Sequence, residues 1–188
     1  IAADLPTAPV IFDAAPDAPL GGGLVDLPCR VGDRTGGFHQ PMPLVIGPPN
    51  DTVYYQTEVY RLAVAVTEAA PFRIHLVPPS TPILRQGAKQ LKVVVERDAG
   101  FTGDVTLQML WNPPGISSST SVPVPAAQGE ASYQLNATGD APLRTWKLAV
   151  LAHATVQGGE VWLSSDLVDL AVADSFEGGA IQLAATEQ

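Results

Sequence analysis

The chain has 188 residues, of which 46% are hydrophobic and 15% charged, so it can bury a core and is not a disordered tail. Its net charge of −9, from ten Lys and Arg against nineteen Asp and Glu, excludes the clustered basic surface that nucleic acid or an anionic membrane requires. No apolar run is long enough to span a bilayer, and the single cysteine, Cys29, excludes a disulfide within the chain.

Alternating strand patterns dominate the chain, and no segment has a convincing helical period. The eighteen prolines and seventeen glycines indicate many short segments joined by turns. The patterns predict seven strands in the second part of the chain, with a bulge in the last one near Ser164–Asp166. They lie near residues 72–77 (continued by 82–86), 89–98, 103–111, 119–124, 130–137, 144–156 and 160–173.

An internal repeat relates the two parts of the chain. Residues 53–65 read VYYQTEVYRLAVA and residues 161–173 read VWLSSDLVDLAVA, an offset of 108 residues. With a gap of one or two residues, the repeat also places Cys29 on the position of Leu135, which faces the core in the predicted strand. We therefore expect Cys29 to be a small buried hydrophobic residue.

The strand spacing and the length of the repeat predict an all-β fold of tandem immunoglobulin-like β-sandwiches, the first incomplete at its N-terminus. Residues 1–69 are expected to form the C-terminal part of a first repeat, and residues 70–174 a complete sandwich. Residues 175–188 are expected to be the first strand of a following repeat, or a linker. Two hypotheses explain the incomplete repeat: the chain is a fragment of a longer tandem array, or a terminal strand completes the open sandwich of a neighbouring chain.

Residues 70–174, and less closely residues 20–69, resemble a known family. Its pattern includes Gly100-Phe101, Gly103, the turn Pro113–Gly115 and Ala141-Pro142. These features resemble the immunoglobulin-like repeats of large exported bacterial proteins, which often accompany pre-peptidase C-terminal-type domains. A more distant similarity is to the immunoglobulin-like module associated with α-galactosidases. The resemblance implies a non-catalytic, extracytoplasmic spacer or accessory unit, and it brings no catalytic residues with it.

No catalytic, cofactor-binding or metal-binding motif stands out in the sequence. His39, His75 and His153 lack metal-ligand spacing, and the last two are expected to be solvated. Three carboxylates flank one turn and are interpreted either as an acidic surface turn or as a Ca²⁺ site between modules; they are Glu96, Asp98 and Asp104. We predict neither an enzyme nor a cofactor.

Four aromatic residues are candidates for contact with a ligand or partner, because exposed rings on one face can stack on sugars. They are Tyr54, Tyr55, Tyr60 and Trp162. Tyr54 and Trp162 occupy matching places in the repeat and fall on the outward phase of their strands. By contrast, Trp111 in the segment LWNPPGI keeps phase with Val105 and Leu107, so it is expected to be largely buried and to pack against Trp146.

The sequence thus predicts a secreted or cell-surface module pair that acts as a structural spacer, an assembly element or an adhesion element. Its expected partners are neighbouring immunoglobulin-like repeats of the same or another chain, with a cell-surface protein or a polysaccharide as further options. Two alternatives remain open: a carbohydrate-binding accessory module of a secreted enzyme, and an assembly subunit that polymerises by β-strand exchange.

Overall fold

The computed structural model describes residues 7–15 and 17–174, and the predicted first strand of a following repeat, 175–188, lies outside them. The described residues are all-β. They divide into two units, which we name the sandwich unit (residues 7–12 and 70–174) and the hairpin unit (residues 13–69). The boundary near residue 70 separates them, but residues 7–12 belong with the sandwich unit rather than with the segment that follows them.

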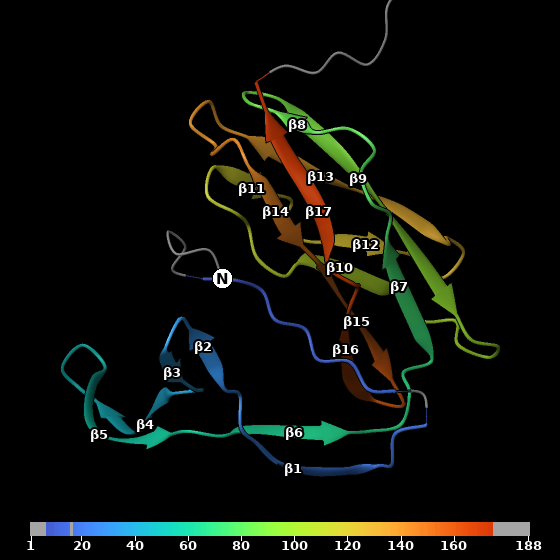
Figure 1. Ribbon diagram of the computed structural model, residues 1–188. Helices are drawn as coiled ribbons and strands as arrows, with labels where there is room; N and C mark the ends of the chain where they lie inside the picture. The colour runs from blue at the N-terminus through green and yellow to red at the C-terminus, as the bar shows by residue number, and fades with distance from the viewer. Residues whose placement is uncertain (1–6, 16, 175–188) are drawn as a thin grey trace, which may run out of the picture. The chain divides into compact units, whose positions relative to one another are not determined.

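The sandwich unit contains two four-stranded sheets and one three-stranded sheet (Figure 1). In the first sheet the order is β11-β13-β9-β7, in the second β12-β10-β15-β16, and in the third β14-β17-β8. All pairs are antiparallel except β17 with β8. The strands are β7 (Phe72–Leu76), β8 (Ile83–Leu84), β9 (Ala88–Arg97), β10 (Val105–Met109), β11 (Ile116–Ser118), β12 (Val122–Val124), β13 (Glu130–Ala137), β14 (Thr145–Leu148), β15 (Val150–Val156), β16 (Gly159–Ser164) and β17 (Val168–Ala173).

One core joins these sheets, because each strand turns its alternate apolar residues inward. Val93 of β9, Leu107 of β10 and Tyr133 of β13 are fully buried. The side chains on the opposite phase of β9 and β13, such as Lys92 and Ser132, are exposed. The alternation in the sequence therefore corresponds to the two faces of a sandwich sheet.

The two longest predicted strands are each divided between sheets. The predicted strand 144–156 is interrupted at Ala149, and the predicted strand 160–173 is interrupted between Ser164 and Val168. Instead of a bulge within one strand, β16 belongs to the second sheet and β17 to the third. Strands that change sheets in this way close the corner of a sandwich.

Trp111 is half-buried rather than largely buried. Its ring lies at the end of β10, where it meets Trp146 edge-on with a centroid separation of 6.0 Å, so the predicted contact is confirmed. The indole N–H donates a hydrogen bond to the carbonyl of Lys147 at 3.1 Å. The ring stays partly exposed because the strand ends at Met109, so Trp111 no longer lies between the two sheets.

The hairpin unit consists of three separate two-stranded antiparallel ladders, β1–β6, β2–β3 and β4–β5. None of its described residues is buried. Its strands are β1 (Gly21–Val25), β2 (Cys29–Val31), β3 (Arg34–Gly36), β4 (Gln40–Gly47), β5 (Thr52–Val59) and β6 (Leu62–Val66).

Cys29 lies in this unit and is exposed, so the prediction that it is buried was wrong. The chain leaves β1 at Val25 and forms the short β2–β3 hairpin, in which Cys29 pairs with Gly36. No second layer of described residues covers that hairpin. The gapped match with Leu135 identified a strand position correctly but not the cover that would bury it.

Candidate interaction surfaces

The internal repeat is also present in the strand pairing. In the β4–β5 hairpin, Gly47 pairs with Thr52, and the residues 108 positions later, Thr155 and Glu160, pair with each other in the β15–β16 hairpin. Ile46 with Val53 and Ala154 with Val161 are related in the same way. The β4–β5 hairpin is thus the counterpart of the β15–β16 hairpin, residue for residue at these pairs.

The two hairpins differ in what covers them. Val150, Ala152 and Ala154 of β15 are 0%, 0% and 4% exposed, because the first sheet packs on them. Their counterparts in β4, which are Met42, Leu44 and Ile46, are 48%, 51% and 53% exposed.

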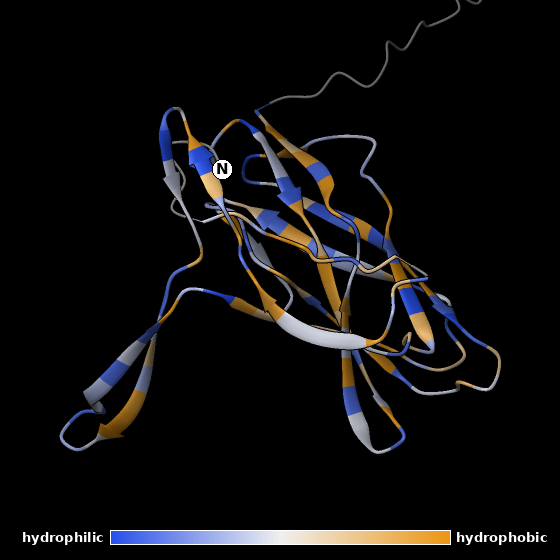
Figure 2. Ribbon diagram, turned by 60° about the horizontal axis from the view of Figure 1, so that its bottom comes forward, coloured by the Kyte–Doolittle hydropathy of each residue, from blue (hydrophilic) through white to orange (hydrophobic). Residues whose placement is uncertain are grey.

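The partner strands continue this contrast. Val161 and Leu163 of β16 pack against the core, whereas their counterparts Val53 and Tyr55 are 45% and 60% exposed. Figure 2 shows the hydrophobic end of β4. We name the five exposed residues the open hairpin surface: Met42, Leu44, Ile46, Val53 and Tyr55.

Two prolines mark the free edge of this hairpin. Pro41 and Pro43 of β4 pair with Glu58 and Gln56 of β5, so the ladder continues past both prolines, and its register shifts only after Pro43. Proline has no N–H, so within a ladder it is tolerated where that group would point away from the neighbouring strand. The missing donors therefore belong to the other edge of β4.

In the complete sandwich, the same edge of the counterpart strand is occupied. β15 pairs there with β10, including Leu151 with Gln108, and Leu151 is the counterpart of Pro43. The hairpin unit therefore presents an apolar surface where the sandwich has its core. It does so on a strand whose free edge lacks two of the donors that an added strand would use.

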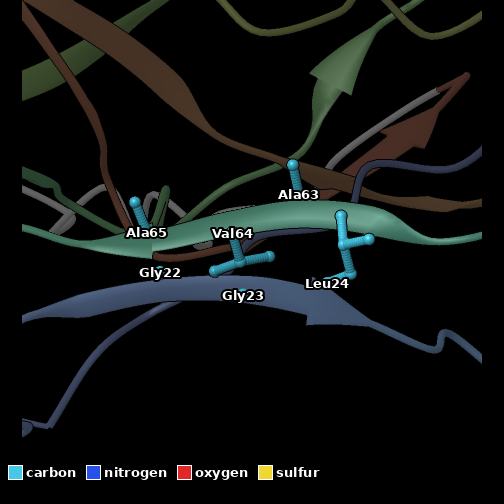
Figure 3. Close-up of a pocket in the computed structure, with 6 residues that line it drawn as sticks. All are labelled: Gly22, Gly23, Leu24, Ala63, Val64 and Ala65. Atoms are coloured by element: carbon cyan, nitrogen blue, oxygen red, sulfur yellow. The ribbon is translucent and has the colours of Figure 1, made fainter.

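A shallow hollow lies over the β1–β6 ladder, where three consecutive glycines carry no side chains (Figure 3). Gly23 pairs with Val64, and Leu24 pairs with Ala63. A Cβ atom at Gly21 or Gly23 would meet nothing within 4 Å, so packing within the unit does not require these glycines. Nothing in the described residues explains why glycine occupies these positions.

The predicted aromatic residues are distributed over both units. Tyr54, Tyr55 and Tyr60 belong to the hairpin unit and are 60%, 60% and 64% exposed. The Tyr60 ring lies 5.4 Å from the ring of His39, whose Nε2 contacts a carboxylate oxygen of Glu58. Trp162 belongs to the sandwich unit and is 49% exposed, on the outward phase of β16. Tyr54 and Tyr55, on opposite phases of β5, are equally exposed, so exposure does not distinguish an outward face there.

Trp162 takes part in a small cluster on the β15–β16 hairpin. Its ring stacks on His153 with centroids 4.2 Å apart and an interplanar angle of 16°. Its indole N–H donates to a carboxylate oxygen of Glu160 at 3.3 Å, and the other oxygen lies 3.6 Å from Nδ1 of His153. The side chain of His153 is 20% exposed, less than its expected solvated position implies, because Trp162 covers one face of its ring.

A groove of about 300 Å³ adjoins this cluster. One side is formed by the N-terminal segment of the sandwich unit, residues 10–12, and the other by Leu110, Leu151 and Trp162–Ser164. The residues that line the groove are mostly apolar, and Trp162 is one of them. Sequence reasoning identified Trp162 but missed His153 and Glu160, since only the cross-strand pairing of His153 with Trp162 brings them together.

The three carboxylates that could have held Ca²⁺ bind protein groups separately. Asp98 pairs with Arg73 at 3.0 Å, Asp104 accepts the N–H of Ala126 at 2.9 Å, and Glu96 lies 3.6 Å from His75. Within the described residues, no group of three or more His, Cys, Asp or Glu side chains is arranged to hold a metal ion. No helix of the described residues could span a membrane.

Comparisons with known proteins identify no family. No family model matches the chain, and no curated protein matches it. Among solved structures, the chain is similar to domains 4 and 5 of the S-layer protein SbsC. The match has 17% identity and a TM-score of 0.31, and it covers 62% of this chain and 62% of that one.

Proposed function

We propose that this chain is a non-catalytic, extracytoplasmic pair of immunoglobulin-like modules, which serves as a spacer, assembly or adhesion element at the cell surface. The observation that carries the proposal is the structural repeat: two hairpins 108 residues apart share the pairs next to the turn, from Gly47–Thr52 to Thr155–Glu160, although the ladder of β4 has a register shift at Val45 that β15 lacks. A chain built from repeated sandwich units extends by adding modules, and each module contacts its neighbours. The resemblance to repeats of exported bacterial proteins supports the same function.

The arrangement of the charged groups in the sandwich unit is consistent with a structural role. Its ion pairs lie on the surface, as in Lys147–Asp169 at 2.7 Å and Arg73–Asp98 at 3.0 Å. Exposed pairs of this kind add little stability, and they keep the module soluble. The core between the sheets of this unit is apolar, which suits a rigid spacer.

Protease treatment of intact cells that produce the protein tests this function. An antibody against the chain should detect it before treatment and lose the signal afterwards, while a cytoplasmic marker persists. Protection of the chain in intact cells, with cleavage only after lysis, would contradict a surface location.

A second candidate function is binding of a polysaccharide at Trp162. The observation that favours it is the half-exposed indole ring beside Glu160 and the adjoining groove, a combination that offers both a stacking surface and a hydrogen-bond acceptor. A glycan array probed with the chain and with Trp162→Ala tests it. Binding that disappears in the variant supports this candidate, and absence of binding by the unsubstituted chain removes it.

A further inference from the structure

The second sheet of the sandwich unit carries an apolar patch on its outer face. Leu151 of β15 and Trp162 of β16 lie on the phase opposite the core, and Leu110 follows β10 on the same phase. The outward residues of the first sheet are mostly polar, as in Lys92 and Ser132. A sheet face that meets only water is expected to be polar, so this patch indicates a surface that another segment contacts.

Residues 7–12, which we name the N-terminal segment, lie on this patch. They belong to the sandwich unit, although the whole hairpin unit separates them from β7 along the chain. Residues 10–12 line the groove beside Trp162 together with Leu110 and Leu151, and residues 7–10 line a second hollow with Leu110 and Trp111. The segment therefore extends from the Trp111 side of the patch to the Trp162 side.

The N-terminal segment is not part of a sheet. It forms no strand, and it lies outside every ladder of the described residues. Ala8, Pro9 and Ile11 are half-buried, whereas Val10 and Phe12 are 64% and 51% exposed. The segment thus meets the sheet through one side only, and it can detach without the loss of any ladder.

We propose that the outer face of the second sheet is a docking surface for an extended apolar peptide, and that residues 7–12 of the same chain are its occupant. The partner that fits is a short run of apolar side chains with a proline, which packs on a sheet face and needs no ladder hydrogen bonds. The contacts themselves select this occupant, because the segment is seated on the patch. The inference does not depend on where in the cell the chain acts.

Tryptophan emission of the full chain reports on this contact. Trp111 and Trp162 lie at the two ends of the segment, whereas Trp146 is 2% exposed in the core. Ile11→Asp places a carboxylate against the apolar patch, so the segment should detach. The emission should then shift to longer wavelength, and quenching by acrylamide should increase. An unchanged emission would overturn the proposal, because the segment would not cover the patch.

Val77→Asp is the matched control for an added carboxylate. Val77 is 39% exposed in the same unit, and it lines neither the groove nor the second hollow. Its substitution should leave the emission and the quenching unchanged. An equal shift in both variants would mean that the unit responds to any added charge, and the proposal would fail.

A synthetic peptide tests whether the surface binds the segment without the covalent connection. The peptide of residues 7–15, TAPVIFDAA, contains no tryptophan, so the emission comes from the chain alone. Added to the Ile11→Asp chain, it should restore the original emission in a saturable way. The original chain should need at least about tenfold more peptide for any response, because its own segment competes at a high effective concentration.

The same peptide with Ile11→Asp is the control and should restore nothing. If the original peptide fails to restore the emission, or if both peptides act equally, the outer face is not a specific docking surface and the proposal is overturned.

Dilution distinguishes the two sources of the segment. A segment from the same chain stays on the patch at any concentration, whereas one from a second copy is lost as the copies dissociate. The emission of the original chain should therefore be independent of its concentration. A shift to longer wavelength on dilution would assign the segment to a second copy and overturn the occupant proposed here.

Discussion

Ser165 holds Val150 by two hydrogen bonds at the corner where the chain passes between sheets. The N–H of Ser165 donates to the carbonyl of Val150 at 2.8 Å, and the Ser165 hydroxyl accepts the N–H of Val150 at 3.1 Å. Ser165 is 1% exposed, and it follows the end of β16 just as Val150 follows the interruption at Ala149. The hydroxyl takes the place of a ladder partner for a buried backbone N–H.

Ser165→Ala should therefore destabilise the sandwich unit more than its small change in volume implies. The substitution leaves the buried N–H of Val150 without a partner, which costs about 1–3 kcal/mol in the free energy of unfolding. Urea unfolding followed by tryptophan emission measures this cost. Ser132→Ala, at an exposed position of β13, should change stability by less than about 0.5 kcal/mol, and an equal loss in both variants would contradict the role of the hydroxyl.

Sequence periodicity predicted most of the sandwich core. Leu107, Tyr133 and Leu135 occupy the inward phase of their segments and are fully buried. Alternation works here because each strand has one face on the core. The alternation did not show that residues 160–173 form two strands, β16 and β17. One bent strand and two strands in different sheets give the same alternating pattern.

The same periodicity could not predict the open hairpin surface. Val53 and Tyr55 have the alternation of Val161 and Leu163, but they are exposed. The pattern reports which side of a strand a residue faces, and cover depends on whether another layer is present. For the same reason Cys29 was expected to be buried, and the cluster of His153 with Trp162 was missed.

Arg97 ties two loops to β9, and Arg97→Lys should loosen both. Its guanidinium donates to the carbonyls of Gly103, Val124, Pro125 and Gln128, at distances from 2.6 to 3.2 Å. A lysine ammonium cannot span four carbonyls on two loops, because its donors sit on one atom.

We expect Arg97→Lys to lose about 1–3 kcal/mol in the free energy of unfolding, measured in urea. Arg73→Lys provides the control, since Arg73 is exposed and makes one ion pair with Asp98. That substitution should cost less than about 1 kcal/mol. Equal losses would show that the four carbonyl contacts add nothing specific to arginine.

Gly115, at the end of the turn in LWNPPGI, has two separate reasons to be glycine. Its φ of 74° lies in the left-handed region, and a Cβ atom there would lie 2.5 Å from Cα of Ala141. Gly158 has a φ of 83° but open space around it, so it isolates the backbone effect.

Gly158→Ala should cost about 1–2 kcal/mol from backbone strain, and Gly115→Ala about 2–5 kcal/mol, because overpacking against Ala141 adds to that strain. Thermal and urea unfolding of the two variants measure the difference. If both lose the same amount, the contact with Ala141 relaxes at no cost.

The pKa of Asp140 gives a prediction for pH. The Thr138 hydroxyl donates to this carboxylate at 2.5 Å, and together with the Asp140 backbone N–H it lowers the pKa from the ordinary value of 3.8. Because the folded pKa lies below the unfolded one, the contribution to stability is present above pH 3.8 and is lost as the pH falls through the folded pKa.

Thr138→Val removes the hydroxyl, so the pKa of Asp140 should rise toward 3.8 in a carboxyl NMR titration. The loss of stability relative to the original chain should be largest near neutral pH and shrink in acid, as the carboxylate in both proteins becomes protonated. Thr145→Val, at an exposed position of β14, should leave the titration of Asp140 unchanged. A pKa of Asp140 in the original chain at or above 3.8 would refute the role of the hydroxyl.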